Sequence, residues 1–308
     1  MTGSVGMGTS ALRGGRSFCK VMTMAFDKDV FAPGVLNGRT ALITGGGTGL
    51  GFAIAAAYAK FGAKVVVIGR RQEKLEVAVA EIRAAGGSAL SVRADVRDYE
   101  QVAAAVRAAI GAFGQIDILV NCAAGNFYCP TEQLSPNGWR VVVDIDLNGT
   151  FLCCKAAFDA LCASRYGGRV ISLITTFGTT GWPGQAHAGA AKAGILSLSR
   201  SLAVEWARHG IRVNTISPGP IEGTEGVAKL YEQRQQKGLQ MRRVPLGRLG
   251  SALDISNAAV FLASPAGEFI TGADLIVDGG RWLKYVADPS EAVDIASKDA
   301  ASAPSSGE

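Results

Sequence analysis

The sequence T-G-G-G-T-G-L-G occupies residues 44–51, between a short apolar run and an alanine-rich segment. This order predicts a strand, a glycine turn and a helix. Gly45 permits a tight turn, Gly49 places no side chain between the backbone and a phosphate, and Gly51 lets the helix lie close to the strand. The free N–H groups of the first helical turn, together with the helix dipole, favour a bound pyrophosphate. A glycine-rich loop can be merely a flexible turn, but the flanking strand and helix favour dinucleotide binding.

Apolar runs and helical segments alternate along the rest of the chain. Strands are predicted at 41–43, 65–68, 89–94, 116–121, 169–174, 212–217 and 274–277, and helices at 50–61, 72–85, 99–113, 139–164, 186–208 and 253–263. The alternation predicts an α/β fold with a single doubly wound parallel sheet of the Rossmann type and helices on both faces. We expect one domain over residues 35–285, between a disordered leader (1–34) and a disordered tail (286–308).

The composition describes a soluble globular protein of 308 residues, with 48% hydrophobic and 19% charged residues. The net charge of +5 is mild and no basic run is interleaved with aromatic residues, so nucleic acid is not an expected partner. The six cysteines and two histidines show no metal-site spacing, so no metal is expected. No apolar stretch is long enough to span a bilayer, and no membrane partner is expected.

The two ends of the sequence bear on the compartment. Residues 1–26 contain no Asp or Glu and carry three basic residues. They fit either a mitochondrial transit peptide, which would place the protein in the matrix, or a disordered leader, which we prefer. Free thiols favour a reducing compartment, and we expect a cytoplasmic protein. The final Ser-Gly-Glu is not a peroxisomal address.

The residues that follow the predicted strands indicate the cofactor, because ligands of such sheets bind at the carboxyl ends of the strands. Arg70 and Arg71 stand where an NAD site would place a carboxylate for the ribose hydroxyls. Two arginines suit a 2′-phosphate, so NADPH is expected; the alternative is a solvated pair at a helix start. In the glycine turn the expected contacts are Gly45, Gly47, Thr48, Gly49, Leu50 and Gly51.

Two further strand ends extend this predicted site. Asp95 and Val96 are placed to meet the adenine, although Asp95 fits a helix cap equally well. After the fourth predicted strand come Asn121 and the small residues 122–125, which let a cofactor lie close, so Asn121 and Ala123 are expected contacts; the alternative is a tight turn.

Together these residues resemble the short-chain dehydrogenase/reductase family over residues 35–282, along with Lys192, the sequence Pro-Gly-Pro-Ile at 218–221 and Asp-Gly-Gly at 278–280. The resemblance implies that Lys192 binds the nicotinamide ribose, and it adds Pro218, Gly219 and Ile221 as cofactor contacts. The chain departs from the family in three places. Ala188 replaces the catalytic tyrosine, Thr175 or Thr176 replaces the assisting serine, and Asp146 replaces a helix asparagine.

The departures match one subgroup, the 2,4-dienoyl-CoA reductases, most closely the peroxisomal type, in segments 121–127, 187–192 and 218–226. This resemblance implies NADPH-dependent reduction of a 2,4-dienoyl-CoA to a trans-3-enoyl-CoA in the oxidation of unsaturated fatty acids. Asp146 would hold the proton-donating water, with Lys192 nearby as the second catalytic residue. Without the resemblance, Asp146 would be interpreted as a helix-surface carboxylate and Lys192 as a solvated lysine.

The same resemblance places the acyl-CoA substrate. Asn126 and Phe127 would line its pocket, and Ser135 would either join them or cap the following helix. Basic residues between 228 and 250, Lys229 among them, could hold the CoA phosphates or form a solvated helix face. Arg97 is a second candidate at the CoA end. A homo-oligomer, by family habit a tetramer, is expected.

Two other functions remain open at this point. One is a conventional carbonyl reductase of the 3-oxoacyl type that uses another acid, and Ala188 argues against it because alanine cannot donate a proton. The other is a catalytically silent NADP(H)-binding module, against which the retained Lys192 and Asp146 argue.

Overall fold

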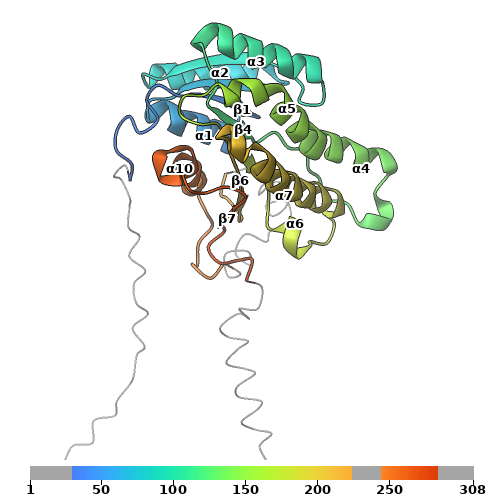
Figure 1. The fold of residues 1–308 in the computed structure, drawn as a ribbon. Helices are drawn as coiled ribbons and strands as arrows, with labels where there is room; N and C mark the ends of the chain where they lie inside the picture. The colour runs from blue at the N-terminus through green and yellow to red at the C-terminus, as the bar shows by residue number, and fades with distance from the viewer. Residues whose placement is uncertain (1–29, 224–243, 284–308) are drawn as a thin grey trace, which may run out of the picture. The chain divides into compact units, whose positions relative to one another are not determined.

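The computed structural model describes residues 30–223 and 244–283. The chain divides into Met1–Ala32 and Pro33–Glu308, and every element described below belongs to the second part. Within the described residues, seven strands form one sheet in the order β3-β2-β1-β4-β5-β6-β7, and every neighbouring pair is parallel (Figure 1). The strands are β1 (Thr40–Thr44), β2 (Lys64–Gly69), β3 (Ser88–Arg93), β4 (Ile118–Asn121), β5 (Arg169–Leu173), β6 (Arg212–Pro218) and β7 (Asp274–Val277). The predicted fold class is confirmed.

Helices cover both faces of this sheet (Figure 1). They are α1 (Gly49–Lys60), α2 (Gln72–Ala84), α3 (Tyr99–Phe113), α4 (Pro136–Val143), α5 (Gly149–Cys162), α6 (Phe177–Thr180), α7 (Ala186–Trp206) and α10 (Ala252–Ala263). Helix α1 packs against α2 and α10, where the Tyr58 hydroxyl donates to the Ala259 carbonyl at 3.0 Å. Helices α3, α5 and α7 form one core cluster with the sheet.

The central strands are buried on both faces. All five residues of β1 are buried, as are Val65, Val66, Val67 and Ile68 of β2. A strand covered by helices on both sides has no polar face, so apolar residues follow one another at 41–43 and 65–68. Thr44 adds a polar link, because its hydroxyl accepts the N–H groups of Cys122 and Ala123, both at 2.9 Å. The end of β1 is thereby fixed to the turn that follows β4.

The predicted helical region at 139–164 is confirmed as helical, but it begins earlier, ends at Cys162 and contains a π-helical segment. Helix α4 begins at Pro136, because the Ser135 side chain accepts the Gly138 N–H at 3.0 Å and proline suits the first helical position. A π-helical segment, Asp144–Asn148, then separates α4 from α5. The Thr150 hydroxyl donates to the Asp146 carbonyl at 2.6 Å across this junction. Such π segments are rare and often occur at functional sites.

Two searches of the described residues bear on ligands and membranes. They contain no group of three or more His, Cys, Asp or Glu side chains arranged to hold a metal ion. None of the helices in the described part of the chain combines the length and apolarity that crossing a bilayer requires.

Candidate active site

A cleft of about 350 Å³ lies at the carboxyl ends of β1 to β4. Its lining includes most of the residues expected to contact the cofactor, namely Gly45, Gly47, Thr48, Gly49, Leu50, Gly51, Arg70, Arg71, Asp95, Val96 and Ala123. It also contains Cys122 and Ala124 from the predicted turn of small residues, and residues that were not predicted as contacts: Gly69, Lys74, Leu75, Ala94 and Ile145. Lys74 lies four residues after Arg70, in the first turn of α2. A basic residue at this spacing after a strand end could have been predicted as a further contact.

The glycine turn has the shape that a pyrophosphate requires. Gly45 and Gly49 have positive φ angles of 64° and 55°, a conformation that favours glycine. A Cβ on Gly51 would overlap the Gly45 carbonyl, whereas a Cβ on Gly49 would meet nothing within 4 Å. Helix α1 begins at Gly49 with no side-chain cap and no acidic residue in its first turn. Its N-terminal N–H groups and dipole therefore suit an anion, and the chain fits a dinucleotide here.

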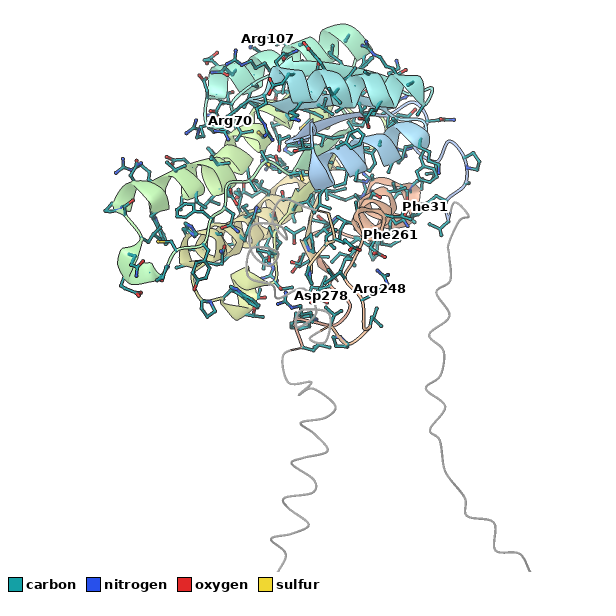
Figure 2. The ribbon with its side chains drawn as sticks, turned by 180° about the vertical axis from the view of Figure 1, so that it is seen from behind. Phe31, Arg70, Arg107, Arg248, Phe261 and Asp278 are labelled. Atoms are coloured by element: carbon teal, nitrogen blue, oxygen red, sulfur yellow. The ribbon has the colours of Figure 1, made fainter. Side chains whose placement is uncertain are left out.

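Asp95 lies in this cleft as part of an ion pair. Its carboxylate accepts two hydrogen bonds from Arg97, Nε–Oδ1 at 3.0 Å and Nη2–Oδ2 at 2.6 Å. The hydrogen-bonding Arg97 guanidinium, with a smaller contribution from Arg70, lowers the pKa of Asp95. The alternative that Asp95 caps a helix is wrong, because the cap of α3 is Asp98. Arg70 follows β2 directly (Figure 2).

A second ion pair, which is buried, joins three segments of the chain. Lys192 Nζ on α7 lies 3.0 Å from Asp146 Oδ2 in the π segment. Asp146 Oδ1 accepts the Gly125 N–H at 2.7 Å, and Lys192 also donates to the Leu173 carbonyl at 3.1 Å. Asp146 is 1% exposed and Lys192 8%. The alternatives of a surface carboxylate and a solvated lysine are therefore wrong.

The surroundings of this pair provide few other proton donors. Ala188, one helical turn before Lys192, is buried and presents only a methyl group. Thr176 is also buried, just beyond the end of β5. Asn121 does not line the cleft: its amide donates to the Ser172 hydroxyl at 3.2 Å and links β4 to β5. The Asp146–Lys192 pair is therefore the main candidate for positioning a proton at this site.

The residues that follow β6 line a different cavity. Gly219 and Ile221 belong to a cavity of about 410 Å³ that also contains Arg248 and Asp278 (Figure 2). Pro218 is the last residue of β6. Gly219 and Ile221 are not in the lining of the first cleft and Pro218 is in neither lining, so their role as cofactor contacts stays a prediction.

The predicted substrate residues are only partly brought together. Asn126 lines the first cleft, and the neighbouring Phe127 is 39% exposed. Arg97 is held by Asp95 and does not line either cavity, while Ser135 caps α4. Lys229 lies outside the described residues, as do the other basic residues up to 243. Arg248 is described and pairs with Asp254.

Gln185 and His187 are two polar residues near this site that sequence analysis missed. Gln185 Nε2 donates to the Phe127 carbonyl at 3.3 Å, and the His187 ring meets the Phe127 ring edge-on with centroids 4.5 Å apart. Both side chains are buried. Their position at the start of the helix that carries Lys192 could have indicated that they lie near the site.

Comparison with known proteins places the chain among reductases. The family model described as enoyl-(acyl carrier protein) reductase matches residues 45–281. The "Probable 2,4-dienoyl-CoA reductase" of Bacillus subtilis, named as (2E)-enoyl-CoA-producing, is 43% identical over 80% of this chain and 97% of its own length. The "Peroxisomal 2,4-dienoyl-CoA reductase" of Arabidopsis thaliana, named as (3E)-enoyl-CoA-producing, is 42% identical over 82% of this chain and 87% of its own.

Solved structures agree with this assignment. The crystal structure of a short chain dehydrogenase from Bacillus anthracis has a TM-score of 0.77 and 41% identity, covering 82% of this chain and all of its own. The "Crystal structure of a putative short-chain alcohol dehydrogenase" from Sinorhizobium meliloti has the same TM-score and 38% identity over 82% of this chain and 99% of its own. The chain belongs to the short-chain dehydrogenase/reductase family, whose members use a nicotinamide cofactor.

Proposed function

We propose that residues 35–285 form an NADPH-dependent 2,4-dienoyl-CoA reductase that acts in the oxidation of unsaturated fatty acids. The observation that carries the proposal is the buried Asp146–Lys192 pair at 3.0 Å, with Ala188 one turn before the lysine. A carbonyl reductase needs an acid at the carbonyl oxygen, and a methyl group cannot supply one. Reduction of a conjugated diene instead needs a proton at carbon. The names of the relatives support the same chemistry.

The preference for NADPH rests on the charge at the end of β2. Arg70 and Arg71 both line the first cleft, and Lys74 adds a third positive charge. Arginine presents a planar fork of N–H donors that matches the oxygens of a phosphate. The acid in this lining, Asp95, is already engaged by Arg97. A 2′-phosphate therefore finds donors here, whereas ribose hydroxyls find no free carboxylate in this lining.

In this reaction the protein's side chains would position the proton donor, the cofactor and the acyl chain. When bound, the nicotinamide cofactor supplies a hydride to the far end of the diene. The Gly125 N–H and Lys192 fix the Asp146 carboxylate, which orients a water as the proton source. Lys192, anchored on the Leu173 carbonyl, keeps one further N–H direction for a ribose hydroxyl. Asn126 and Phe127 line the acyl side.

The names of the relatives divide on the position of the product's double bond, because one produces a (2E)-enoyl-CoA and others a (3E)-enoyl-CoA. We propose the 3E product, which requires protonation at the α-carbon. Turnover in heavy water distinguishes the two outcomes. Deuterium at the α-carbon, located by proton NMR of the product, supports the proposal, and deuterium at the γ-carbon contradicts it.

The function itself is tested by the loss of NADPH absorbance with trans-2,trans-4-hexadienoyl-CoA. A 3-oxoacyl-CoA and a reaction without substrate are the matched controls. Turnover of the dienoyl thioester alone is expected. Preferred turnover of the 3-oxoacyl-CoA would make the protein a conventional carbonyl reductase, and NADPH binding without turnover of either substrate would make it a silent binding module.

A further inference from the structure

The turn that leads into α7 holds two buried polar atoms without a hydrogen-bond partner among the described residues. They are Gln185 Oε1 and His187 Nε2, on side chains that are 1% and 0% exposed. Buried polar atoms are nearly always paired, so an unpaired donor beside a proposed active site needs an explanation.

The hydrogen bond at the other ring nitrogen fixes which nitrogen carries the proton. The Ala188 N–H donates to His187 Nδ1 at 2.8 Å, so Nδ1 must present a lone pair. The neutral ring therefore carries its proton on Nε2. Burial lowers the pKa of His187, against smaller opposing effects of the Gln185 carbonyl, the Asp146 charge and the Phe127 carbonyl. The ring is thus a neutral donor near neutral pH, and neither carbonyl has hydrogen-bond geometry with Nε2.

The contacts of this turn place the donor beside the proposed substrate residues. The His187 ring stands at 89° to the Phe127 ring, with centroids 4.5 Å apart. Gln185 Nε2 holds the Phe127 carbonyl at 3.3 Å, and the Cys129 N–H donates to the Gly184 carbonyl at 3.0 Å. The turn and the loop that carries Phe127 therefore form one unit, and the Asp146 charge is close enough to act on the ring.

We propose that His187 contacts the substrate, its Nε2–H donating to the carbonyl oxygen of the acyl thioester seated against Phe127. This inference rests on the proposed function. Negative charge develops on that oxygen when a hydride adds to the far end of the diene, and a fixed donor in a dry site stabilises it. Gln185 is a positioning residue, since its amide holds the backbone of Phe127. The unpaired Nε2–H is thereby explained as a donor that awaits its acceptor.

The test compares His187→Leu, which removes the donor, with His187→Gln, whose amide N–H reaches a similar position. His209→Leu, at the exposed histidine after α7, is the matched control. Thermal unfolding and NADPH binding establish that each variant is folded. The probe is trans-2,trans-4-hexadienoyl-CoA, assayed for turnover with NADPH and by its absorption when bound in the presence of NADP⁺.

Loss of one oxyanion donor typically lowers kcat by about 10²- to 10³-fold, and we expect this range for His187→Leu with an unchanged KM for NADPH. A donor on the carbonyl shifts the bound dienoyl absorption to longer wavelength. We expect this shift in the parent, His187→Gln and His209→Leu, and its loss in His187→Leu. Parental kcat and an unchanged shift in His187→Leu would overturn the inference alone. A parent protein without dienoyl-CoA turnover would overturn the proposed function and, with it, the acceptor assigned to His187.

Discussion

Asp146 and Lys192 are two opposite charges that the fold removes from water together. Burying an ion is costly unless its partner and further hydrogen bonds compensate, and here the Gly125 N–H and the Leu173 carbonyl supply those bonds. Because both charged groups are held in place beside the first cleft, the Asp146 carboxylate can orient a proton donor there. The pair therefore links the stability of the site to its proposed chemistry.

Replacing Asp146 by Asn should separate these two contributions. The amide keeps the shape but loses the charge, so we expect turnover of the dienoyl-CoA to fall by about 10²- to 10⁴-fold. NADPH binding should persist, because the glycine turn is untouched. Stability should also fall, by up to about 3–5 kcal/mol, since Lys192 loses its counter-charge. Steady-state turnover, cofactor titration and urea unfolding measure the three quantities.

The matched control is Asp144→Asn, the same change two residues earlier in the π segment, where the carboxylate accepts the Asn148 amide at 2.8 Å. It should retain parental turnover. Restoring a tyrosine at Ala188 should not rescue Asp146→Asn, because an acid placed for a carbonyl oxygen is not placed for the α-carbon. Near-parental turnover in Asp146→Asn would remove this residue from the mechanism.

Arg70 is a single residue at which the preference for NADPH can be tested. Arg70→Ala should raise the KM for NADPH at least about 10-fold, the loss expected when a charge-assisted bond to phosphate worth 1.5–3 kcal/mol is removed. The KM for NADH should stay nearly unchanged. Arg107→Ala, at an exposed arginine of α3, controls for general charge effects (Figure 2). Equal use of both cofactors by the parent protein would contradict this prediction.

Single positions in the glycine turn were predictable because only glycine satisfies their geometry. The tight turn at Gly45, which has a positive φ, and the close approach at Gly51 follow from the motif itself. The hydrogen bond from Gly125 to Asp146 and the unpaired Nε2 of His187 were not predictable. They depend on how segments distant in the sequence meet, and periodicity carries no information about such contacts.

At the scale of elements, all seven predicted strands were confirmed, while helix α6 and the start of α4 at Pro136 were not predicted. Strands of this sheet are short apolar runs between turns, a pattern that sequence reveals directly. The π segment at Asp144–Asn148 could not be predicted, because one wider turn leaves the apolar pattern on either side almost unchanged. Its consequence is local: it sets the position of Asp146 between α4 and α5.

Helix α10 begins with a capping box that can be tested by pH. The Ser251 hydroxyl accepts the Asp254 N–H, and the Asp254 carboxylate accepts the Ser251 N–H at 2.7 Å. The hydrogen-bonding Arg248 guanidinium, with further bonds from Ser251, lowers the pKa of Asp254 to about 2. A carboxylate with a lowered folded-state pKa stabilises the fold above its unfolded pKa, near 3.9, and loses that contribution as pH falls through about 2.

Asp254→Asn should therefore lower the free energy of unfolding by about 1 kcal/mol at neutral pH. The difference from the parent should shrink between about pH 4 and pH 2. Urea unfolding at neutral and acid pH measures both effects. Asp159→Asn, at an exposed carboxylate of α5, should change little at either pH. A destabilisation of Asp254→Asn that persists unchanged in acid would contradict the assigned role of the charge.

For the whole molecule, the class of the fold followed from alternation, but the strand order did not. The order β3-β2-β1-β4-β5-β6-β7 reverses direction between β1 and β4, and the first cleft lies at the ends of these strands. Ligands of doubly wound sheets bind at such a reversal. The position of the cleft is therefore a property of the sheet, whereas its chemistry belongs to the residues after each strand.

The last prediction concerns assembly into a homo-oligomer, which the family resemblance implies. Trp139 on α4 and Phe151 on α5 are 42% and 46% exposed, and large exposed apolar side chains often mark protein interfaces. If these helices bind a second copy of the chain, Phe151→Glu should shift the protein towards smaller species in light scattering coupled to size exclusion, because an unpaired charge would be buried in the interface. Val77→Glu, at a residue on α2 that is 55% exposed, is the control and should leave the assembly unchanged. A parent that is monomeric, or a Phe151→Glu variant with the parental mass, would exclude an interface at these helices.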